Sequence, residues 1–263
     1  MIKNYVDCIS KMKTPFLEGF TAVISGSSKG LGREMALTFA ELGANVMVCC
    51  NKNLKEAEEV CKAIRAMGRA CELFQGDLGN ISEAKALVEK AVSRFGGIDI
   101  LINNAGITNP GHFSLLTEAD WDRLEKANMK SAFNCAHHAM PYLEKSSMGR
   151  VLNISSVCGK SGGLGAGANY CATKAGMIGF TKALANQYAA KGITVNAIAP
   201  AMIDTEMITW RTQEQMQDVI ERIPLGRIGK KEEVAWAAAF LCSPFASFIT
   251  GYTMDINGGL YMD

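Results

Sequence analysis

Tyr170 and Lys174 are the two residues of this sequence whose types and spacing most directly suggest acid–base chemistry. If residues 168–176 are helical, both side chains lie on one face, one turn apart. A free tyrosine has a pKa near ~10, and an ammonium beside it favours the phenolate and lowers that pKa. Such a pair can donate a proton to a developing alkoxide or remove one from an alcohol. An isolated pair at this spacing is more often one packed and one solvated residue, so a catalytic pair is indicated only where neighbouring motifs support it.

A glycine-rich turn near the N-terminus is the first of these surroundings. Residues 20–25 form a compact apolar run, glycines follow at Gly26, Gly30 and Gly32, and residues 33–42 have helical character. Strand, glycine turn and helix are the context that a dinucleotide-binding loop requires. Glycines let the backbone approach a pyrophosphate, and the helix N-terminus supplies amide donors and positive potential.

Two further motifs lie between the glycine turn and the tyrosine. The sequence Asn103-Asn104-Ala105-Gly106 follows a strand-like run, and its small residues let the chain pass close to a cofactor. Residues 150–157 form another strand-like run that contains Ser155 and Ser156, and Ser156 precedes Tyr170 by 14 positions. The four motifs thus form an ordered set along the chain.

In this order and at these distances, the motifs resemble those of the short-chain dehydrogenase/reductase family, over residues 19–263. The C-terminal stretch, residues 248–262, is most similar to the 3-oxoacyl-[acyl-carrier-protein] reductases within that family. The resemblance implies an oxidoreductase that transfers a hydride between a nicotinamide cofactor and a carbonyl or secondary alcohol. The cofactor carries the hydride chemistry, and the protein supplies geometry and electrostatics.

The resemblance also implies four catalytic residues. Tyr170 donates the proton, and Lys174 lowers the pKa of Tyr170 and binds the nicotinamide ribose. Ser156 forms a hydrogen bond with the substrate oxygen; it is preferred to Ser155 because it precedes Val-x-Gly, as in the family pattern. Asn128 bends its helix and holds a proton-relay water against the lysine.

The cofactor is expected to be NADP(H). An acidic residue at the end of the second strand would accept hydrogen bonds from the adenosine ribose and repel a 2′-phosphate. Residues 49–53 contain no acid there, and Asn51, Lys52 and Lys29 can contact a phosphate. Asn103 is expected to brace the sheet. The full set of expected cofactor contacts is Gly26, Ser27, Ser28, Lys29, Gly30, Leu31, Gly32, Asn51, Lys52, Asp77, Leu78, Asn104, Ala105, Gly106, Tyr170, Lys174, Pro200, Ile203 and Thr205.

The elements that must position these residues alternate between strand-like and helical segments. This alternation predicts an α/β fold: a single-domain Rossmann-type, doubly wound parallel sheet of about seven strands with helices on both faces. Residues 1–18 are expected to form an N-terminal extension, and residues 19–263 the NADP-binding domain with a lid at 204–223. Strands are expected at residues 20–25, 45–50, 70–75, 98–103, 151–155, 193–198 and 253–256.

The composition narrows the function classes. An apolar fraction of 48% allows a sizeable core, and a net charge of +1 gives no reason to expect nucleic-acid or membrane binding. The nine cysteines include no Cys-x-x-Cys spacing, which indicates reduced thiols in a cytoplasmic protein without a metal site. Cys171 is interpreted as a packing residue and not as a nucleophile.

The sequence alone does not determine the identity of the substrate. The leading hypothesis is an NADPH-dependent reductase of 3-oxoacyl thioesters; the alternatives are a dehydrogenase for a sugar acid, polyol or other secondary alcohol, and a non-catalytic NADP(H)-binding regulator. The intact catalytic set argues against the regulator. The substrate pocket is expected at residues 108–113, 161–165 and 206–217. Two departures from the family bear on it: Ala201 replaces a glycine, and the loop before Tyr170 is longer.

Two kinds of partner are expected besides the small carbonyl or alcohol substrate. An acyl carrier protein, which is acidic, would need basic residues beside the entrance, and Lys160 and Arg211 are the candidates. The chain is also expected to form a homotetramer. Helices around residues 117–142 and 168–190 carry apolar residues on more than one side, and the apolar tail at 251–263 would be covered by a neighbouring subunit.

Overall fold

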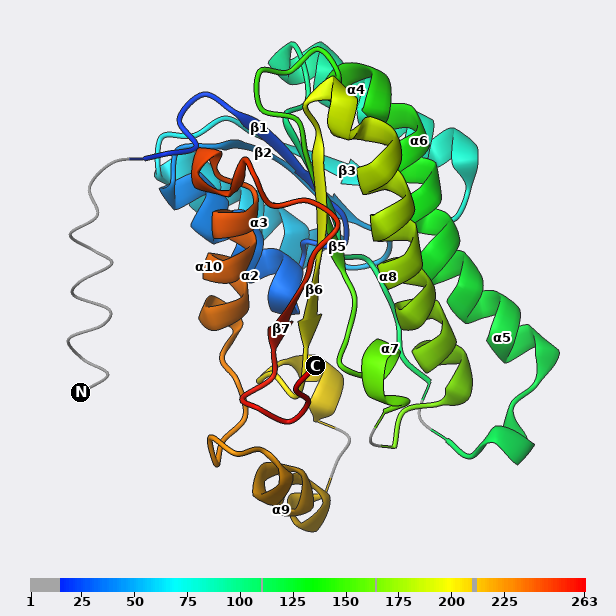
Figure 1. The fold of residues 1–263 in the computed structure, drawn as a ribbon. Coiled ribbons are helices and arrows are strands. Elements are labelled where there is room, and N and C mark those ends of the chain that lie inside the picture. The colour runs from blue at the N-terminus through cyan, green and yellow to red at the C-terminus, as the bar shows by residue number, and fades with distance from the viewer. Residues whose placement is uncertain (1–14, 110, 164, 210–211) are drawn as a thin grey trace.

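The computed structural model describes residues 15–263 except 110, 164 and 210–211, so most of the expected N-terminal extension lies outside it. The described strands form one parallel sheet in the order β3-β2-β1-β4-β5-β6-β7 (Figure 1). They are β1 (Thr21–Ile24), β2 (Asn45–Cys50), β3 (Cys71–Gln75), β4 (Ile100–Asn103), β5 (Arg150–Ile154), β6 (Thr194–Pro200) and β7 (Thr253–Ile256). The expected doubly wound parallel sheet is therefore confirmed.

Helices cover both faces of this sheet. They are α2 (Gly30–Glu41), α3 (Leu54–Ala66), α4 (Ile81–Phe95), α5 (Glu118–Leu124), α6 (Ser131–Leu143), α7 (Cys158–Ser161), α8 (Ala168–Tyr188), α9 (Gln213–Arg222) and α10 (Lys231–Leu241). Helices α2, α3 and α10 pack on one face, and α4, α6 and α8 pack on the other (Figure 1). None of the helices in the described residues is long and apolar enough to span a membrane.

The two faces of the sheet have separate apolar cores. Successive side chains of a strand point to opposite faces. In β1, Ala22 and Ile24 pack in the core that contains Phe39 of α2, whereas Val23 packs in the core that contains Leu87 of α4. A strand in the middle of such a sheet is apolar at every position, because both faces are covered. This explains why residues 20–25 form a continuous apolar run and not an alternating one.

The N-terminal boundary of the folded part lies before residue 19. Leu17 is fully buried in the core, and its backbone N–H donates a hydrogen bond to the carbonyl of Leu42 at 2.9 Å. The sequence alone placed Leu17 in the extension, because a single apolar residue beside charged ones gives no periodic signal.

The carboxyl ends of the strands define where a ligand can bind. The chain runs outward from β1 through β2 to β3 and then crosses back to β4, which pairs with the other side of β1. At such a switch in strand order the loops diverge and leave a crevice. The expected lid, residues 204–223, contains the short 3₁₀-helix η4 (Glu206–Ile208) and α9, which projects beyond this edge of the sheet (Figure 1).

Candidate active site

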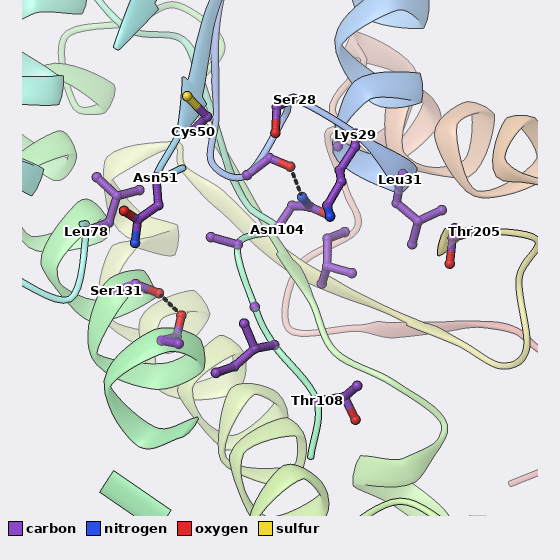
Figure 2. A pocket seen from close by; sticks show the side chains of 18 of the residues that line it. Ser28, Lys29, Leu31, Cys50, Asn51, Leu78, Asn104, Thr108, Ser131 and Thr205 are labelled. Atoms are coloured by element: carbon purple, nitrogen blue, oxygen red, sulfur yellow. Dashed lines mark hydrogen bonds between the residues drawn. The ribbon is translucent and has the colours of Figure 1, made fainter. Parts of the chain in front are cut away.

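A cavity of about 900 Å³ opens at the carboxyl edge of the sheet. Small-molecule and cofactor sites typically enclose about 300–1,000 Å³. Most of the expected site residues, from six loops and from α8, line this one cavity (Figure 2). They are Gly26, Ser28, Lys29, Gly30, Leu31, Gly32, Asn51, Lys52, Asp77, Leu78, Asn104, Ala105, Gly106, Ser156, Tyr170, Lys174, Pro200, Ile203 and Thr205. Two expected residues, Ser27 and Asn128, do not line it.

The glycine turn after β1 lies directly against the segment after β4. Gly26 has a φ of +63°, and a Cβ added to it would lie 2.9 Å from the Cα of Ala105. A Cβ on Gly32 would lie 2.2 Å from the carbonyl oxygen of Gly26. No other residue type fits either position without moving the backbone. The turn therefore presents bare backbone and the N-terminus of α2 to the cavity, and these fit the pyrophosphate of a dinucleotide.

The two asparagines after β4 have different roles. Asn103 donates a hydrogen bond to Asn153 Oδ1 at 2.8 Å inside the sheet, as expected. Asn104 lines the cavity, but its amide donates to the carbonyls of Ser25 and Gly26 at 2.9 and 3.0 Å (Figure 2). Its polar group thus holds the glycine turn in place and does not point freely at a cofactor.

Ser27 faces inward and is fully buried. Its Oγ donates to the carbonyl of Ile24 at 2.7 Å and accepts from the N–H of Cys49 at 2.9 Å. The hydroxyl is therefore used to join the ends of β1 and β2. Its neighbour Ser28 lines the cavity instead, so of the two serines only Ser28 is placed where a bound molecule could reach it.

Ser155 and Ser156 differ as Ser27 and Ser28 do: the first is used inside the fold, and the second lines the cavity. Ser155 Oγ donates to the carbonyl of Lys174 at 2.7 Å and so fixes α8 to the end of β5. Ser156 Oγ accepts from the N–H of Cys158 at 3.1 Å and lines the cavity together with Tyr170. A hydrogen bond between Ser156 and Tyr170 lowers the pKa of the phenol, although larger effects oppose it. This arrangement agrees with the choice of Ser156 as the substrate-facing serine.

The pKa of Tyr170 is shifted opposite to the expected direction. Burial raises it above the ordinary value, as does the nearby thiol of Cys158, and both outweigh the hydrogen bond from Ser156. Lys174 does not offset this, because its Nζ lies 5.7 Å from the ring centroid and donates to the carbonyl of Ile154 at 2.7 Å. The same burial lowers the pKa of Lys174 to about 8. At neutral pH Tyr170 is therefore a neutral phenol with a proton to donate.

Asn128 supports the site from behind. It lies in η2 (Glu125–Lys130), a π-helical turn between α5 and α6 that interrupts the helix expected to run through this region. Its side chain accepts from the N–H of Ile107 at 2.8 Å and donates to the carbonyl of Ile107 at 3.1 Å and to Thr173 Oγ1 at 3.0 Å. The amide group is fully used in joining the strand-end loop to α8.

Two charged residues at the cavity, Lys126 and Arg123, were not expected from the sequence. Lys126 Nζ donates to Asp77 Oδ2 at 2.8 Å, and this bond lowers the pKa of Asp77. Arg123 lines the same part of the cavity. Glu206 lies at the other end, with Oε2 3.6 Å from the position that a Cβ on Gly30 would take. Glu206 belongs to the segment 206–217 that was expected at the substrate pocket, whereas nothing in the sequence links Lys126 to Asp77.

The expected substrate side is only partly present. Thr108, Glu206 and Ile208 line the cavity, but the described residues of 161–165 do not. Lys160 is not free to meet a carrier protein: its side chain is 10% exposed and its Nζ donates to Asp255 Oδ2 at 2.6 Å and to Asp263 Oδ2 at 2.9 Å. That expectation was wrong, because its two partners lie 95 and 103 residues away. The other candidate, Arg211, lies outside the described residues.

The doubly wound sheet and the cavity at its carboxyl edge define a dinucleotide-binding type of α/β protein, and comparisons with known proteins show its family. A family described as enoyl-(acyl carrier protein) reductase matches residues 26–261. A 3-oxoacyl-[acyl-carrier-protein] reductase from Staphylococcus aureus (strain Mu50) is 41% identical over 92% of this chain and 98% of its own. Nodulation protein G from Azospirillum brasilense is 38% identical over 91% of this chain and 97% of its own. The chain belongs to the short-chain dehydrogenase/reductase family.

Solved structures give the same result. A short-chain dehydrogenase/reductase from Brucella melitensis, titled glucose/ribitol dehydrogenase, superimposes with a TM-score of 0.88 at 33% identity over 96% of this chain and all of its own. A 3-oxoacyl-[acyl-carrier protein] reductase from Brucella melitensis has a TM-score of 0.89 at 31% identity, over 95% of this chain and 94% of its own. In the part of the chain that the structure describes, no cluster of three or more His, Cys, Asp or Glu side chains could hold a metal ion.

Glu206→Gln should tighten dinucleotide binding. The carboxylate lies beside Gly30, at the N-terminus of α2, where it opposes the negative charge of a pyrophosphate. Charges near a helix terminus contribute about 0.3–1 kcal/mol, so the Kd for NADPH should fall about two- to fivefold in a fluorescence titration. Glu221→Gln on α9 removes the same charge away from the cavity and is the matched control. An unchanged or higher Kd for Glu206→Gln would contradict the electrostatic role.

The buried ammonium of Lys174 predicts a pH-dependent stability. The folded state loses this proton near pH 8, whereas the unfolded lysine keeps it up to about its ordinary value of 10.5. The unfolded state therefore binds more protons in between, so stability rises with pH there. The Tm of the cofactor-free protein relative to that of Lys174→Met should increase between about pH 8 and 10. Equal Tm differences at both pH values would show that the lysine titrates normally.

Proposed function

We propose that this protein is an NADPH-dependent reductase of short 3-oxoacyl thioesters. The observation that carries the proposal is the convergence of Ser156, Tyr170 and Lys174 on one cavity with the glycine turn. The 3-oxoacyl reductase from Staphylococcus aureus, matched over almost its whole length, supports the substrate class. The intact acid–base set speaks against a protein that only binds the dinucleotide.

Each residue of the set has a defined task in the proposed reaction. NADPH held in this cavity would supply the hydride that reduces the carbonyl carbon. Ser156 donates a hydrogen bond to the carbonyl oxygen and positions it beside the phenol. Tyr170, kept neutral by burial, transfers its proton to that oxygen as negative charge develops on it. Lys174 contacts the nicotinamide ribose. Asn128, through Ile107 and Thr173, keeps the surrounding backbone rigid.

Tyr170→Phe should retain NADPH binding and lose most of its turnover. The substitution deletes only the hydroxyl that donates the proton, and general acid–base assistance contributes about 10²–10⁴-fold to the rate. Measured kcat should fall by that factor, while the Kd for NADPH from a fluorescence titration stays within about twofold. Near-normal turnover in this variant would rule out the mechanism.

NADPH should be preferred to NADH. Asn51 and Lys52 line the cavity at the end of β2 where an acid would select NADH, and Lys29 also lines the cavity. Asn51→Asp places a negative charge beside the 2′-phosphate, so the ratio of kcat/KM for NADPH over NADH should fall by about tenfold or more. An equal or reversed ratio in the unmodified protein would refute the assignment.

The substrate class has one serious alternative, a small polyol, keto-sugar or other secondary alcohol. The Brucella structure titled glucose/ribitol dehydrogenase has nearly the same TM-score as the reductase structure, so overall shape does not discriminate between the two. Because Lys160 is already paired, the described part of the entrance gives little support for carrier-protein docking.

A substrate panel separates these alternatives. Acetoacetyl thioesters of coenzyme A and of an acyl carrier protein should be reduced with NADPH, and the coenzyme A thioester should already suffice. Keto-sugars, cyclic ketones and polyols run in both directions are the comparison. Turnover of a keto-sugar without turnover of either thioester would leave the family assignment intact and reject the thioester assignment. Binding of NADPH without turnover of any of them would favour the regulator.

We also propose that the protein is a cytoplasmic homotetramer. Large apolar side chains are exposed on α5 and α6, at Trp121 and Phe133, and near the C-terminus, at Phe248, Tyr252 and Met262. Apolar surface of this kind is typical of subunit interfaces. Light scattering at micromolar concentration measures the mass directly, and a monomer would contradict the proposal. Cell fractionation tests the compartment, for which the partly exposed thiols are the supporting observation.

A further inference from the structure

Two cysteines follow proposed catalytic residues closely in the sequence. Of the eight cysteines in the described residues, six are buried, and Cys158 and Cys171 are partly exposed. Cys158 opens α7 two positions after Ser156, and Cys171 follows Tyr170 in the first turn of α8. The proposed mechanism uses neither thiol.

The sulfur atoms of both cysteines lie close to Gly163. A Cβ on Gly163 would lie 2.9 Å from Cys171 Sγ and 3.4 Å from Cys158 Sγ. The Cys171 thiol donates to the carbonyl of Gly162 at 3.0 Å. The thiols are thus neighbours, within one small space that only glycine leaves open.

The backbones that carry the thiols are also in contact. A Cβ on Gly159 would lie 2.6 Å from the carbonyl carbon of Lys174 and 2.7 Å from the nitrogen of Ala175. No side chain separates α7 from α8 there. A disulfide requires Cα atoms about 4.4–6.8 Å apart, and neighbouring helices reach this spacing only where their backbones approach closely. The loop between them contains Gly162, Gly163 and Gly165, each with a positive φ, so it can adjust.

We propose that Cys158 and Cys171 form a thiol–disulfide exchange site that reacts with a small-molecule disulfide such as oxidised glutathione. The Cys158 sulfur attacks one sulfur of the reagent, which breaks the reagent's S–S bond and releases one glutathione. The Cys171 thiolate then attacks the Cys158 sulfur of the mixed disulfide and displaces the second glutathione. Two protein thiols are oxidised to one disulfide, one glutathione disulfide is reduced to two thiols, and these carry away both protons.

The order of attack follows from the surroundings of the two thiols. Burial and the neighbouring Cys158 both raise the pKa of Cys171. Since the thiolate is the attacking species, Cys171 is the poorer first nucleophile. It is, however, in place to resolve the mixed disulfide, because its sulfur already lies beside that of Cys158.

The disulfide should slow the proposed reduction, and this second half of the inference rests on the proposed function. The link replaces the hydrogen bond from Cys171 to Gly162 and draws together the segments that carry Ser156 and Tyr170. A displacement of about 1 Å in a catalytic group can cost on the order of 100-fold in rate. Dinucleotide binding should persist, because the glycine turn is on other loops.

The chain contains a matched comparison pair. Cys61 and Cys71 also interact, which lowers the pKa of the Cys61 thiol and raises that of Cys71, but both are buried and lie away from the cavity. If proximity alone decided the reaction, both pairs would form a disulfide. If access is also required, only Cys158 and Cys171 should react.

The disulfide can be detected by peptide mass, without an activity assay. The full-length protein is incubated with oxidised glutathione and digested with trypsin under non-reducing conditions. Cleavage after Arg150, Lys160 and Lys174 separates the thiols into peptides 151–160 and 161–174. These peptides should be recovered as one linked species that is two hydrogens lighter than their sum, and dithiothreitol should separate them. Cys158→Ser and Cys171→Ser should each abolish the link, and Cys61→Ala should leave it unchanged.

Three results would overturn the inference. They are no linked species, glutathione retained on both cysteines without a link, or a Cys61–Cys71 link that forms as readily. The linked protein should also lose kcat by about tenfold or more, with recovery after dithiothreitol, and Cys158→Ser, which lacks the first nucleophile, should be insensitive to the same treatment. Full activity in the linked protein would reject the effect on catalysis. If no substrate is turned over, the proposed function fails, and the mass measurement still decides the disulfide.

Discussion

A backbone contact between the glycine turn after β1 and the segment after β4 determines where the rest of the site can lie. Gly26 and Ala105 touch so closely that a Cβ on the glycine would lie 2.9 Å from the Cα of the alanine. Ser25 joins the two segments, because its Oγ accepts from the N–H groups of Asn104 and Ala105, both at 2.9 Å. Each hydrogen bond contributes only about 0.5–1.5 kcal/mol to stability. Together they fix the crevice at the switch point of the sheet, where the dinucleotide-binding backbone is exposed.

A second set of contacts fixes the acid–base residues relative to this crevice. Lys174 Nζ donates to the carbonyl of Ile154, and Ser155 Oγ donates to the carbonyl of Lys174, so the end of β5 and the first turns of α8 hold each other from both sides. The burial that this clamp produces has two electrostatic results. It keeps the Tyr170 phenol protonated, and it weakens the hold of Lys174 on its proton. The raised pKa of Tyr170 and the lowered pKa of Lys174 therefore share one main physical cause, which is the exclusion of water from both side chains.

The sequence predicted the sheet and the cavity well, because both depend on local patterns. Apolar runs, glycine positions and the spacing of Ser156, Tyr170 and Lys174 are all visible along the chain. The sequence failed where a side chain's direction decides. Ser27 and Ser28 are chemically identical, yet the backbone turns one hydroxyl inward and leaves the other at the cavity. Pairing across long distances was equally hidden, as for Lys126, whose partner Asp77 lies 49 residues away.

The pairing of Lys160 changes what the similarity of the C-terminal tail means. The tail resembles the acyl-carrier-protein reductases, and taken alone it would report only on the fold and on subunit contacts. In the structure Lys160 of α7 contacts Asp255 of β7, Asp263 at the C-terminus and the ring of Tyr261, with its Nζ 5.6 Å from the ring centroid. The Lys160 side chain is largely covered, whereas those of Asp255 and Asp263 are 22% and 55% exposed, and these contacts connect the tail to α7. Because α7 begins two residues after Ser156, the tail is also a constraint on the loop beside the reacting carbonyl.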